Sequence, residues 1–200
     1  MSYVLSFSGG LDSTTLLLHL LCRKKSIYAL SFDYGQKHKI ELEFAKRNID
    51  YLKSKGFKVN HKTVDLSSMA TLLESSLTDP NINIPEGHYM DVNMKSTFVP
   101  NRNAIFSSII YAYALSIYKK TKKDVAISLG VHSGDHLIYP DCRPDFYTKL
   151  MSAFQSGNWR IVFVLHGGSN EQGKAQPAIK FYMTRFKLVE LERARYNSPT

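Results

Sequence analysis

Apolar residues along this chain gather in short continuous runs that are separated by longer amphipathic stretches. Four runs have the length and apolar character of buried strands, the third more weakly than the others: residues 4–7, 27–32, 58–64 and 124–129. Residues 14–18 (Thr-Thr-Leu-Leu-Leu) form a leucine-rich run, and apolar residues recur every three or four positions over 42–52, which is typical of helices. Strands that alternate with helices predict an α/β fold, a doubly wound parallel sheet with helices on both faces.

The middle of the chain lacks this periodicity. Between residues 66 and 96 the pattern fades, and two X-Pro pairs at 79–80 and 84–85 favour turns and extended backbone. A loop of this length in a compact domain is typical of a lid or a binding loop. An almost wholly apolar helix is predicted over 104–118 and a further helix over 146–154. The tyrosine-rich face of the 104–118 helix packs either inside the chain or against a second copy, and the second alternative predicts a homodimer.

The character of the sequence changes after Trp159. Residues 160–165 have the pattern of a fifth strand, and 179–195 that of a basic helix. We therefore expect one α/β domain over 1–159 and a separate C-terminal segment over 160–200. A divergent tail, a replaced module and a change of reading frame each account for such a segment.

Residues 8–13, Ser-Gly-Gly-Leu-Asp-Ser, lie between the first strand and the first helix. Glycines let the backbone approach an anion, and the unpaired N–H groups at a helix start attract negative charge. Ser8, Ser13 and Thr14 add hydroxyl donors, while Asp12 can cap the helix or help to hold a metal. A surface turn with a helix cap is the alternative. The whole hexapeptide between a strand and a helix favours a phosphate-binding turn at the carboxyl edge of the sheet.

The spacing of these residues excludes two common nucleotide-binding motifs. No Lys follows the glycines as in a Walker loop, and the G-x-G-x-x-G fingerprint is absent. The hexapeptide resembles the PP-loop of the ATP pyrophosphatases, which cleave ATP between the α and β phosphates. The resemblance implies that ATP contacts the turn and the ends of the first two strands, through Ser6, Phe7, Ser8, Gly9, Gly10, Leu11, Asp12, Ser13, Thr14, Phe32, Asp33 and Tyr34.

Three further segments narrow the resemblance: residues 32–38 (FDYGQKH), 97–103 (TFVPNRN) and 139–143 (YPDCR). In order and spacing they are similar to the QueC family of 7-cyano-7-deazaguanine synthases, over roughly residues 3–159. The resemblance implies ATP and Mg²⁺ as cofactors, with 7-carboxy-7-deazaguanine and ammonia as small-molecule substrates. It implies formation of the nitrile preQ0 through adenylated intermediates, in queuosine biosynthesis.

Candidate residues for this chemistry lie in the same segments. The fork of Arg102 suits a phosphate or a carboxylate, and Asn103 is a predicted N-cap for the helix that follows. Either Asp141 or Asp135 is expected to read the amidine edge of a guanine-like base. The predicted substrate-binding residues are Gln36, His38, Asn101, Arg102, His132, Asp135, Tyr139 and Asp141. The predicted catalytic residues are Asp12, Ser13, Arg102, Asp141 and Arg143.

Several of these residues have simpler alternative roles. Gln36 and His38 are equally typical of a turn before a helix. His132 and His136 either carry protons for the amine or are solvated loop residues. Cys142 is expected to form part of the pocket wall, because no base is placed beside it by the sequence.

Charge and cysteine content limit the choice of partners and cofactors. The net charge of +9 permits nucleic-acid binding, but the lysines are spread out, so an anionic small molecule is the favoured partner. No apolar run reaches the ~20 residues of a membrane span and no signal peptide is evident, which predicts a cytoplasmic protein. The resemblance to the QueC family implies a zinc site of four cysteines. This chain has two, Cys22, expected to be packed in the first helix, and Cys142, so no zinc site is predicted and no residue is assigned as a metal ligand.

Three functions remain open at this point. The first is the ATP-dependent carbon–nitrogen ligase that the resemblance implies. The second is a QueC-like nucleotide-binding module that joins a deazapurine to a protein partner or lacks catalysis, which the missing zinc cysteines favour. The third is a PP-loop enzyme that thiolates tRNA, which is disfavoured because the cysteine pairs typical of those enzymes are missing.

Overall fold

A four-stranded parallel sheet forms the centre of the molecule. The computed structural model describes residues 1–23, 25–73, 75–78, 96–130 and 139–158. The strands are β1 (Ser2–Ser6), β2 (Ser26–Asp33), β3 (Val59–Asp65) and β4 (Val125–Ser128), arranged in the order β3-β2-β1-β4. All of the pairs are parallel. The strand order reverses beside β1, which places a crevice at the carboxyl ends of β1 and β4.

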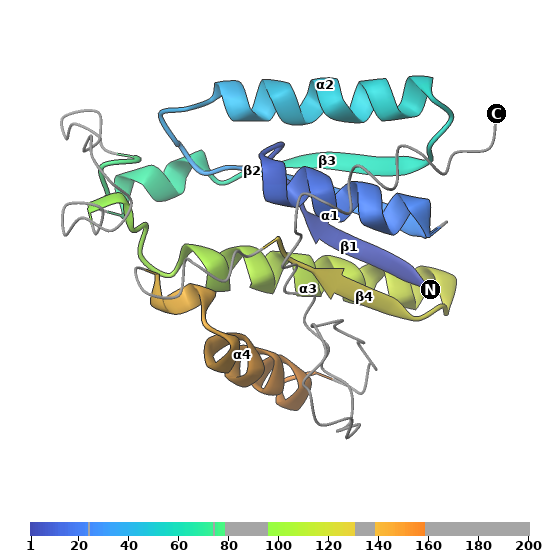
Figure 1. Ribbon diagram of the computed structural model, residues 1–200. Coiled ribbons are helices and arrows are strands. Elements are labelled where there is room, and N and C mark those ends of the chain that lie inside the picture. Colours follow the sequence, from blue (N-terminus) through green and yellow to red (C-terminus); the bar gives the residue numbers. More distant parts are fainter. Residues whose placement is uncertain (24, 74, 79–95, 131–138, 159–200) are drawn as a thin grey trace, which may run out of the picture.

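Helices cover both faces of this sheet (Figure 1). Helices α1 (Leu11–Cys22) and α2 (Ile40–Ser54) pack on one face, and α3 (Arg102–Thr121) and α4 (Pro144–Ser156) lie on the other. Two short 3-10 helices, η1 (Ser67–Thr71) and η4 (Pro140–Cys142), belong to the connections. The predicted doubly wound α/β fold is therefore confirmed.

Successive side chains along each strand point to opposite faces of the sheet, so the core has two layers. Leu5 of β1 and Phe7, which directly follows β1, pack with α1 and α2, whereas Val4 packs with α3. β2 alternates in the same way, with Ala29 on the first side and Leu30 on the second. Most residues of β3 are exposed or half-buried, which accounts for the weaker apolar pattern of its sequence, whereas β4 at the other edge of the described sheet is buried throughout.

Three local expectations are corrected by the structure. Cys22 ends α1 and is exposed, because the apolar face of that helix points away from it. α3 begins at Arg102, so Asn103 lies within its first turn and does not cap it. The N-cap of α1 is Gly10, with no side-chain cap, so Asp12 lies in the first turn and does not cap the helix either.

The tyrosines of α3 make contacts within the chain. Tyr111 is buried, with its ring 4.8 Å from that of Phe154 in α4. Tyr113 packs edge-on against Tyr28, with Lys62 over its ring. The homodimer stays a prediction. Among the residues described, no helix is long and apolar enough to cross a membrane. The expected strand at 160–165 and helix at 179–195 lie outside the described residues, so the domain boundary at 159/160 also stays a prediction.

Candidate functional site

A cavity of about 320 Å³ opens at the carboxyl ends of β1, β2 and β4. Its walls combine the serine-glycine turn, the ends of the strands and the starts of four helices, α1 to α4. They are formed by Ser6, Phe7, Ser8, Ser13, Phe32, Tyr34, Gln36, Glu41, Leu42, Leu77, Arg102, Asn103, Phe106, Leu129, Gly130 and Tyr147. Eight of the predicted site residues therefore line this one cavity, although they come from positions 6 to 102 of the sequence.

The turn between β1 and α1 is held compactly. The Gly10 N–H donates to the Ser8 hydroxyl over 3.2 Å, and the Ser8 and Ser13 hydroxyl oxygens lie 3.1 Å apart. Thr14 donates its hydroxyl to the Gly9 carbonyl over 3.3 Å. Two hydroxyls and the start of α1 therefore meet at the cavity, which is the arrangement that binds anions.

Gly9 is required by the geometry of this turn. Its φ of +83° is strained for residues with a side chain, and an added Cβ would lie 2.7 Å from the Ala45 nitrogen in α2. The turn is thus pressed against α2 with no room for a side chain.

Aromatic rings form the opposite wall. The Phe32 and Phe106 rings are stacked, with centroids 4.1 Å apart and planes 7° apart. The Tyr34 ring lies 5.5 Å from that of Phe106. A flat apolar wall of this kind suits a planar heterocycle.

Arg102 is the first residue of α3, and its side chain contacts the aromatic wall at Tyr34. Its Nη1 donates to the Tyr34 hydroxyl over 3.5 Å, and its Cζ lies 5.8 Å from the centroid of that ring. Burial alone would lower the pKa of Arg102, but the interactions with Tyr34 and with Asp141 and Cys142 outweigh it and raise the pKa. Arg102 therefore brings a permanent positive charge to the cavity.

Asp141 is buried behind this arginine, in η4. Burial raises the pKa of its carboxyl, while Arg102 and two backbone N–H groups partly oppose that rise. Asn103 links the two elements, since its Nδ2 lies 3.5 Å from the Asp141 carbonyl oxygen and 3.6 Å from Cys142 Sγ. The residues that line the cavity include Asn103 but not Cys142, so this thiol is buried one layer behind the wall and does not form it.

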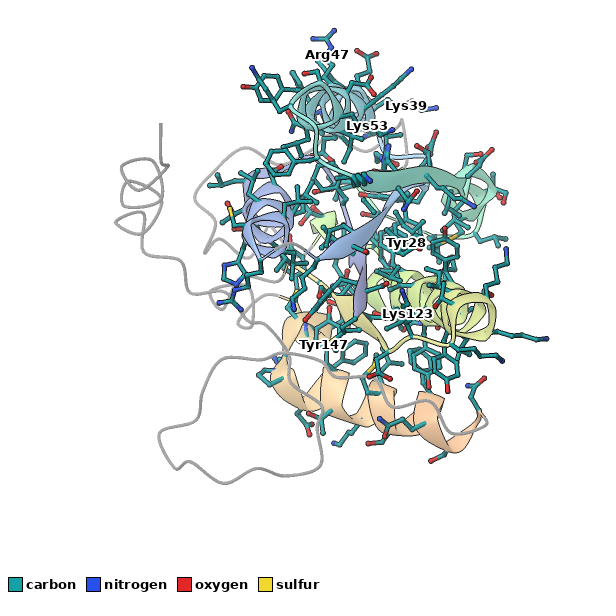
Figure 2. The ribbon with its side chains drawn as sticks, turned by 90° about the vertical axis from the view of Figure 1, so that its right-hand side faces the viewer. Tyr28, Lys39, Arg47, Lys53, Lys123 and Tyr147 are labelled. Atoms are coloured by element: carbon teal, nitrogen blue, oxygen red, sulfur yellow. The ribbon has the colours of Figure 1, made fainter. Side chains whose placement is uncertain are left out.

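Tyr147 of α4 lines the cavity. Its side chain lies on the α4 side of the sheet (Figure 2). Burial raises the pKa of its phenol, and the nearby Cys142 and Asp141 raise it further. The side chain is therefore a neutral hydroxyl at physiological pH, able to contact a ligand without adding charge.

The remaining predicted residues lie around the cavity without lining it. Asp33 accepts from the Gly35 N–H over 3.1 Å and lies 3.9 Å from Lys39 Nζ. His38 is exposed, and the Tyr139 hydroxyl lies 2.6 Å from that of Thr97. The following residues belong to the turn or to helix starts and are absent from the lining: Gly9, Gly10, Leu11, Asp12, Thr14, Asn101, Asp141 and Arg143.

His132, Asp135 and His136 lie outside the described residues. The prediction that either Asp135 or Asp141 reads the base edge therefore stays open. Within the described ranges, no group of three or more His, Cys, Asp or Glu side chains is placed to hold a metal ion.

Sequence reasoning missed part of the lining: Glu41, Leu42, Leu77, Phe106, Leu129, Gly130 and Tyr147. Two of these carried a usable signal. Gly130 directly follows a predicted strand, and Phe106 lies one turn after Arg102 on the same helix. Tyr147 reaches the cavity only because α4 packs beneath the sheet, which no local pattern indicates.

Comparison with known proteins identifies the family. The profile described as "Queuosine biosynthesis protein QueC" matches residues 2–170. This chain belongs to the QueC family. The match extends past residue 159, where the resemblance had been expected to end.

Curated QueC relatives share nearly half of the aligned residues. The chain is 46% identical over 159 residues to the 7-cyano-7-deazaguanine synthase of Hahella chejuensis, covering 79% of this chain and 64% of that protein. It is 47% identical over 160 residues to the 7-cyano-7-deazaguanine synthase 1 of Colwellia psychrerythraea, covering 80% and 68%. The chain thus spans about two thirds of the length of these relatives.

Among solved structures, the NH3-dependent NAD synthetase of Campylobacter jejuni in complex with the nitrate ion is similar with a TM-score of 0.41 and 20% identity. This likeness covers 68% of the present chain and 49% of the synthetase.

Proposed function

We propose that this QueC chain is an ATP-dependent carbon–nitrogen ligase that converts 7-carboxy-7-deazaguanine and ammonia into 7-cyano-7-deazaguanine. The observation that carries the proposal is the single cavity in which the hydroxyls of Ser8 and Ser13, the charge of Arg102 and the Phe32–Phe106 wall meet. An anion site, a cation and a planar apolar wall are what an ATP-dependent reaction on a heterocyclic carboxylate needs. The names of the curated relatives support the same activity.

The reaction is proposed to consist of two activations. The substrate carboxylate attacks the α phosphate of ATP and releases pyrophosphate, and ammonia then displaces AMP to give the amide. The amide oxygen attacks a second ATP in the same way, and loss of AMP and protons leaves the nitrile. No side-chain nucleophile is needed, which agrees with a cavity that lacks a lining cysteine in the described part of the chain.

Named residues fit these roles. The start of α1 with Ser8 and Ser13 would hold the departing pyrophosphate, because free N–H groups and hydroxyls there donate to anions. Arg102 would neutralise charge on the α phosphate or the carboxylate. The Phe32–Phe106 wall would stack on a base.

Magnesium fits the same edge of the cavity. Glu41 lines it, and Asp12 lies in the first turn of α1 beside the serines. Mg²⁺ commonly binds through one or two carboxylates together with phosphate oxygens. When bound, it would supply charge neutralisation on the phosphates.

The experiment is a single incubation of the purified chain with ATP, Mg²⁺, ammonium and 7-carboxy-7-deazaguanine, followed by mass spectrometry. The expected products are the nitrile, AMP and pyrophosphate. Ser13→Ala is expected to slow the reaction, and Ser116→Ala, which alters an exposed serine of α3, is the matched control. Absence of both amide and nitrile, with ATP binding intact, would overturn the ligase and favour a nucleotide-binding module.

A further inference from the structure

A chain of buried polar contacts lies directly behind the serine-glycine turn. The Ser31 hydroxyl donates to the Phe7 carbonyl oxygen over 2.6 Å, and it lies 2.8 Å from His61 Nε2. Ser31 is 1% exposed and His61 is half-buried. These residues come from three neighbouring strands or their ends, and they face the α1 and α2 layer of the core.

The direction of these hydrogen bonds follows from proton counting. A serine hydroxyl carries one hydrogen, and here it is given to the Phe7 carbonyl, so Ser31 must accept from His61. The proton of the neutral imidazole is therefore on Nε2. Burial and the nearby Lys53 lower the pKa of His61, against a smaller opposite effect of Asp50, which keeps the ring neutral. The Phe7 ring meets the imidazole edge-on at 6.2 Å and helps to hold it.

The peptide that receives this hydrogen bond joins Phe7 to Ser8. Since a trans peptide is planar, its N–H points opposite to its C=O. The Phe7 carbonyl points to Ser31 in β2, so the Ser8 N–H points away from β2. β1 lies between β2 and β4, and Ser8 and Gly130 both line the cavity on that side. Within the described residues, the Ser8 N–H has no acceptor of its own.

We propose that His61 and Ser31 are positioning residues that fix the Phe7–Ser8 peptide so that the Ser8 N–H is presented to a nucleotide phosphate. This inference rests on the proposed ATP site. It assigns a function to two buried residues that do not touch the cavity. We call the hydrogen bonds from His61 to Ser31 and from Ser31 to the Phe7 carbonyl the relay. Without the relay, the Phe7–Ser8 peptide can rotate, so that its carbonyl faces the phosphate and repels it.

The test measures binding of ATP and of pyrophosphate to the whole chain by isothermal titration calorimetry. Ser31→Ala removes the donor to Phe7 and is expected to weaken binding about tenfold, as for loss of a hydrogen bond to a charged group. His61→Phe removes only the orienting partner and is expected to weaken it about threefold. His61→Gln, whose amide can donate to Ser31, is expected to restore wild-type affinity.

Two further variants separate positioning from simple loss of stability. The double variant Ser31→Ala/His61→Phe is expected to bind no more weakly than Ser31→Ala, because His61 acts only through Ser31. Ser107→Ala removes an equally buried hydroxyl that has no partner among the described residues and is expected to leave affinity unchanged.

The outcomes are distinct. Lower melting temperatures with unchanged affinity, or additive losses in the double variant, would overturn the relay while leaving the proposed function intact. A wild-type chain that binds neither ATP nor pyrophosphate would overturn the nucleotide site itself. In kinetic assays the relay requires that KM for ATP rises while KM for the deazaguanine carboxylate stays the same.

Discussion

Gly130, at the end of β4, lies against the first turn of α1 at Ser13. A Cβ built on Gly130 would lie 3.2 Å from the Ser13 backbone nitrogen and 3.3 Å from the Asp12 carbonyl carbon. Both contacts are to backbone, which cannot turn aside as a flexible side chain can. The strand order places β4 beside β1, so this contact joins the two sides of the crevice.

Gly130→Ala is therefore expected to push the start of α1 outward by a few tenths of an ångström. Displacement of an anion-binding helix start weakens phosphate contacts, and we expect KM for ATP to rise about tenfold with kcat less affected. The measurement is steady-state kinetics at varied ATP. Gly157→Ala, whose Cβ would make only an ordinary 3.4 Å contact, is the matched control. The same KM for ATP in Gly130→Ala and Gly157→Ala would show that the contact between Gly130 and the start of α1 does not matter for ATP binding.

Arg102→Lys is expected to lower kcat/KM by about 10- to 100-fold. The lysine keeps the charge but loses the planar fork, which lies over the Tyr34 ring and can bind an oxyanion through two parallel N–H groups. Arg47 of α2 gives a close control, since its Cζ also lies 5.8 Å from a ring, that of Phe44, but the side chain is exposed and points outward (Figure 2). Arg47→Lys should leave kinetics unchanged, and a similar loss in both variants would remove Arg102 from the site.

Asp141→Asn is expected to change stability with pH. Because burial raises the native pKa of Asp141 above its ordinary value of 3.8, folding favours the protonated form. That stabilisation is present below the unfolded pKa and is lost as the pH rises through the native pKa. The asparagine variant should thus melt at a higher temperature than wild type at pH 7, and the difference should shrink towards pH 4. Scanning calorimetry measures this, with exposed Asp124→Asn as the control.

The same variant tests the role of Asp141 in recognition. If its carboxylate reads the base edge, Asp141→Asn raises KM for 7-carboxy-7-deazaguanine about tenfold or more and KM for ATP far less. Equal effects on both substrates would argue for a purely structural role.

Zinc content provides a prediction independent of activity. The chain has two cysteines, one exposed and one buried, too few for a zinc site of four cysteine ligands. Metal analysis of the purified protein is expected to find no stoichiometric zinc, and a chelator should not lower the melting temperature. One zinc per chain would show that other ligands replace the missing thiols.

Local pattern was sufficient for the fold. The runs at 4–7, 27–32 and 124–129 became strands of one parallel sheet, because continuous apolar character marks strands that are buried on both faces. The weaker run at 58–64 became β3 of the same sheet, with most of its residues exposed or half-buried. Helix starts were less predictable. α3 begins two residues before the predicted 104, since Asn101 takes a left-handed conformation with φ of 56° and turns the chain into the helix. Single-sequence patterns do not encode such a backbone choice.

The site was only partly predictable, and the reason is spatial. Ser8, Ser13 and Arg102 carry local signals, a turn and a helix start, and the structure brings them around one cavity. The burial of Asp141, and with it the direction of its pKa shift, depends on how η4 packs against the start of α3. Cys22 was expected to pack because its neighbours are leucines, but its position on the helix turns it to solvent.

The place of Tyr147 has a consequence for synthesis of the protein. The cavity is completed by a side chain from the last described helix, long after the serine-glycine turn has been translated. If the cavity binds nucleotide as proposed, a nascent chain from which residue 147 has not yet emerged is expected to gain less stability from nucleotide than the whole chain, because one wall is missing. Cellular ATP is thus expected to protect chains that include α4 from proteases better than chains that end before it.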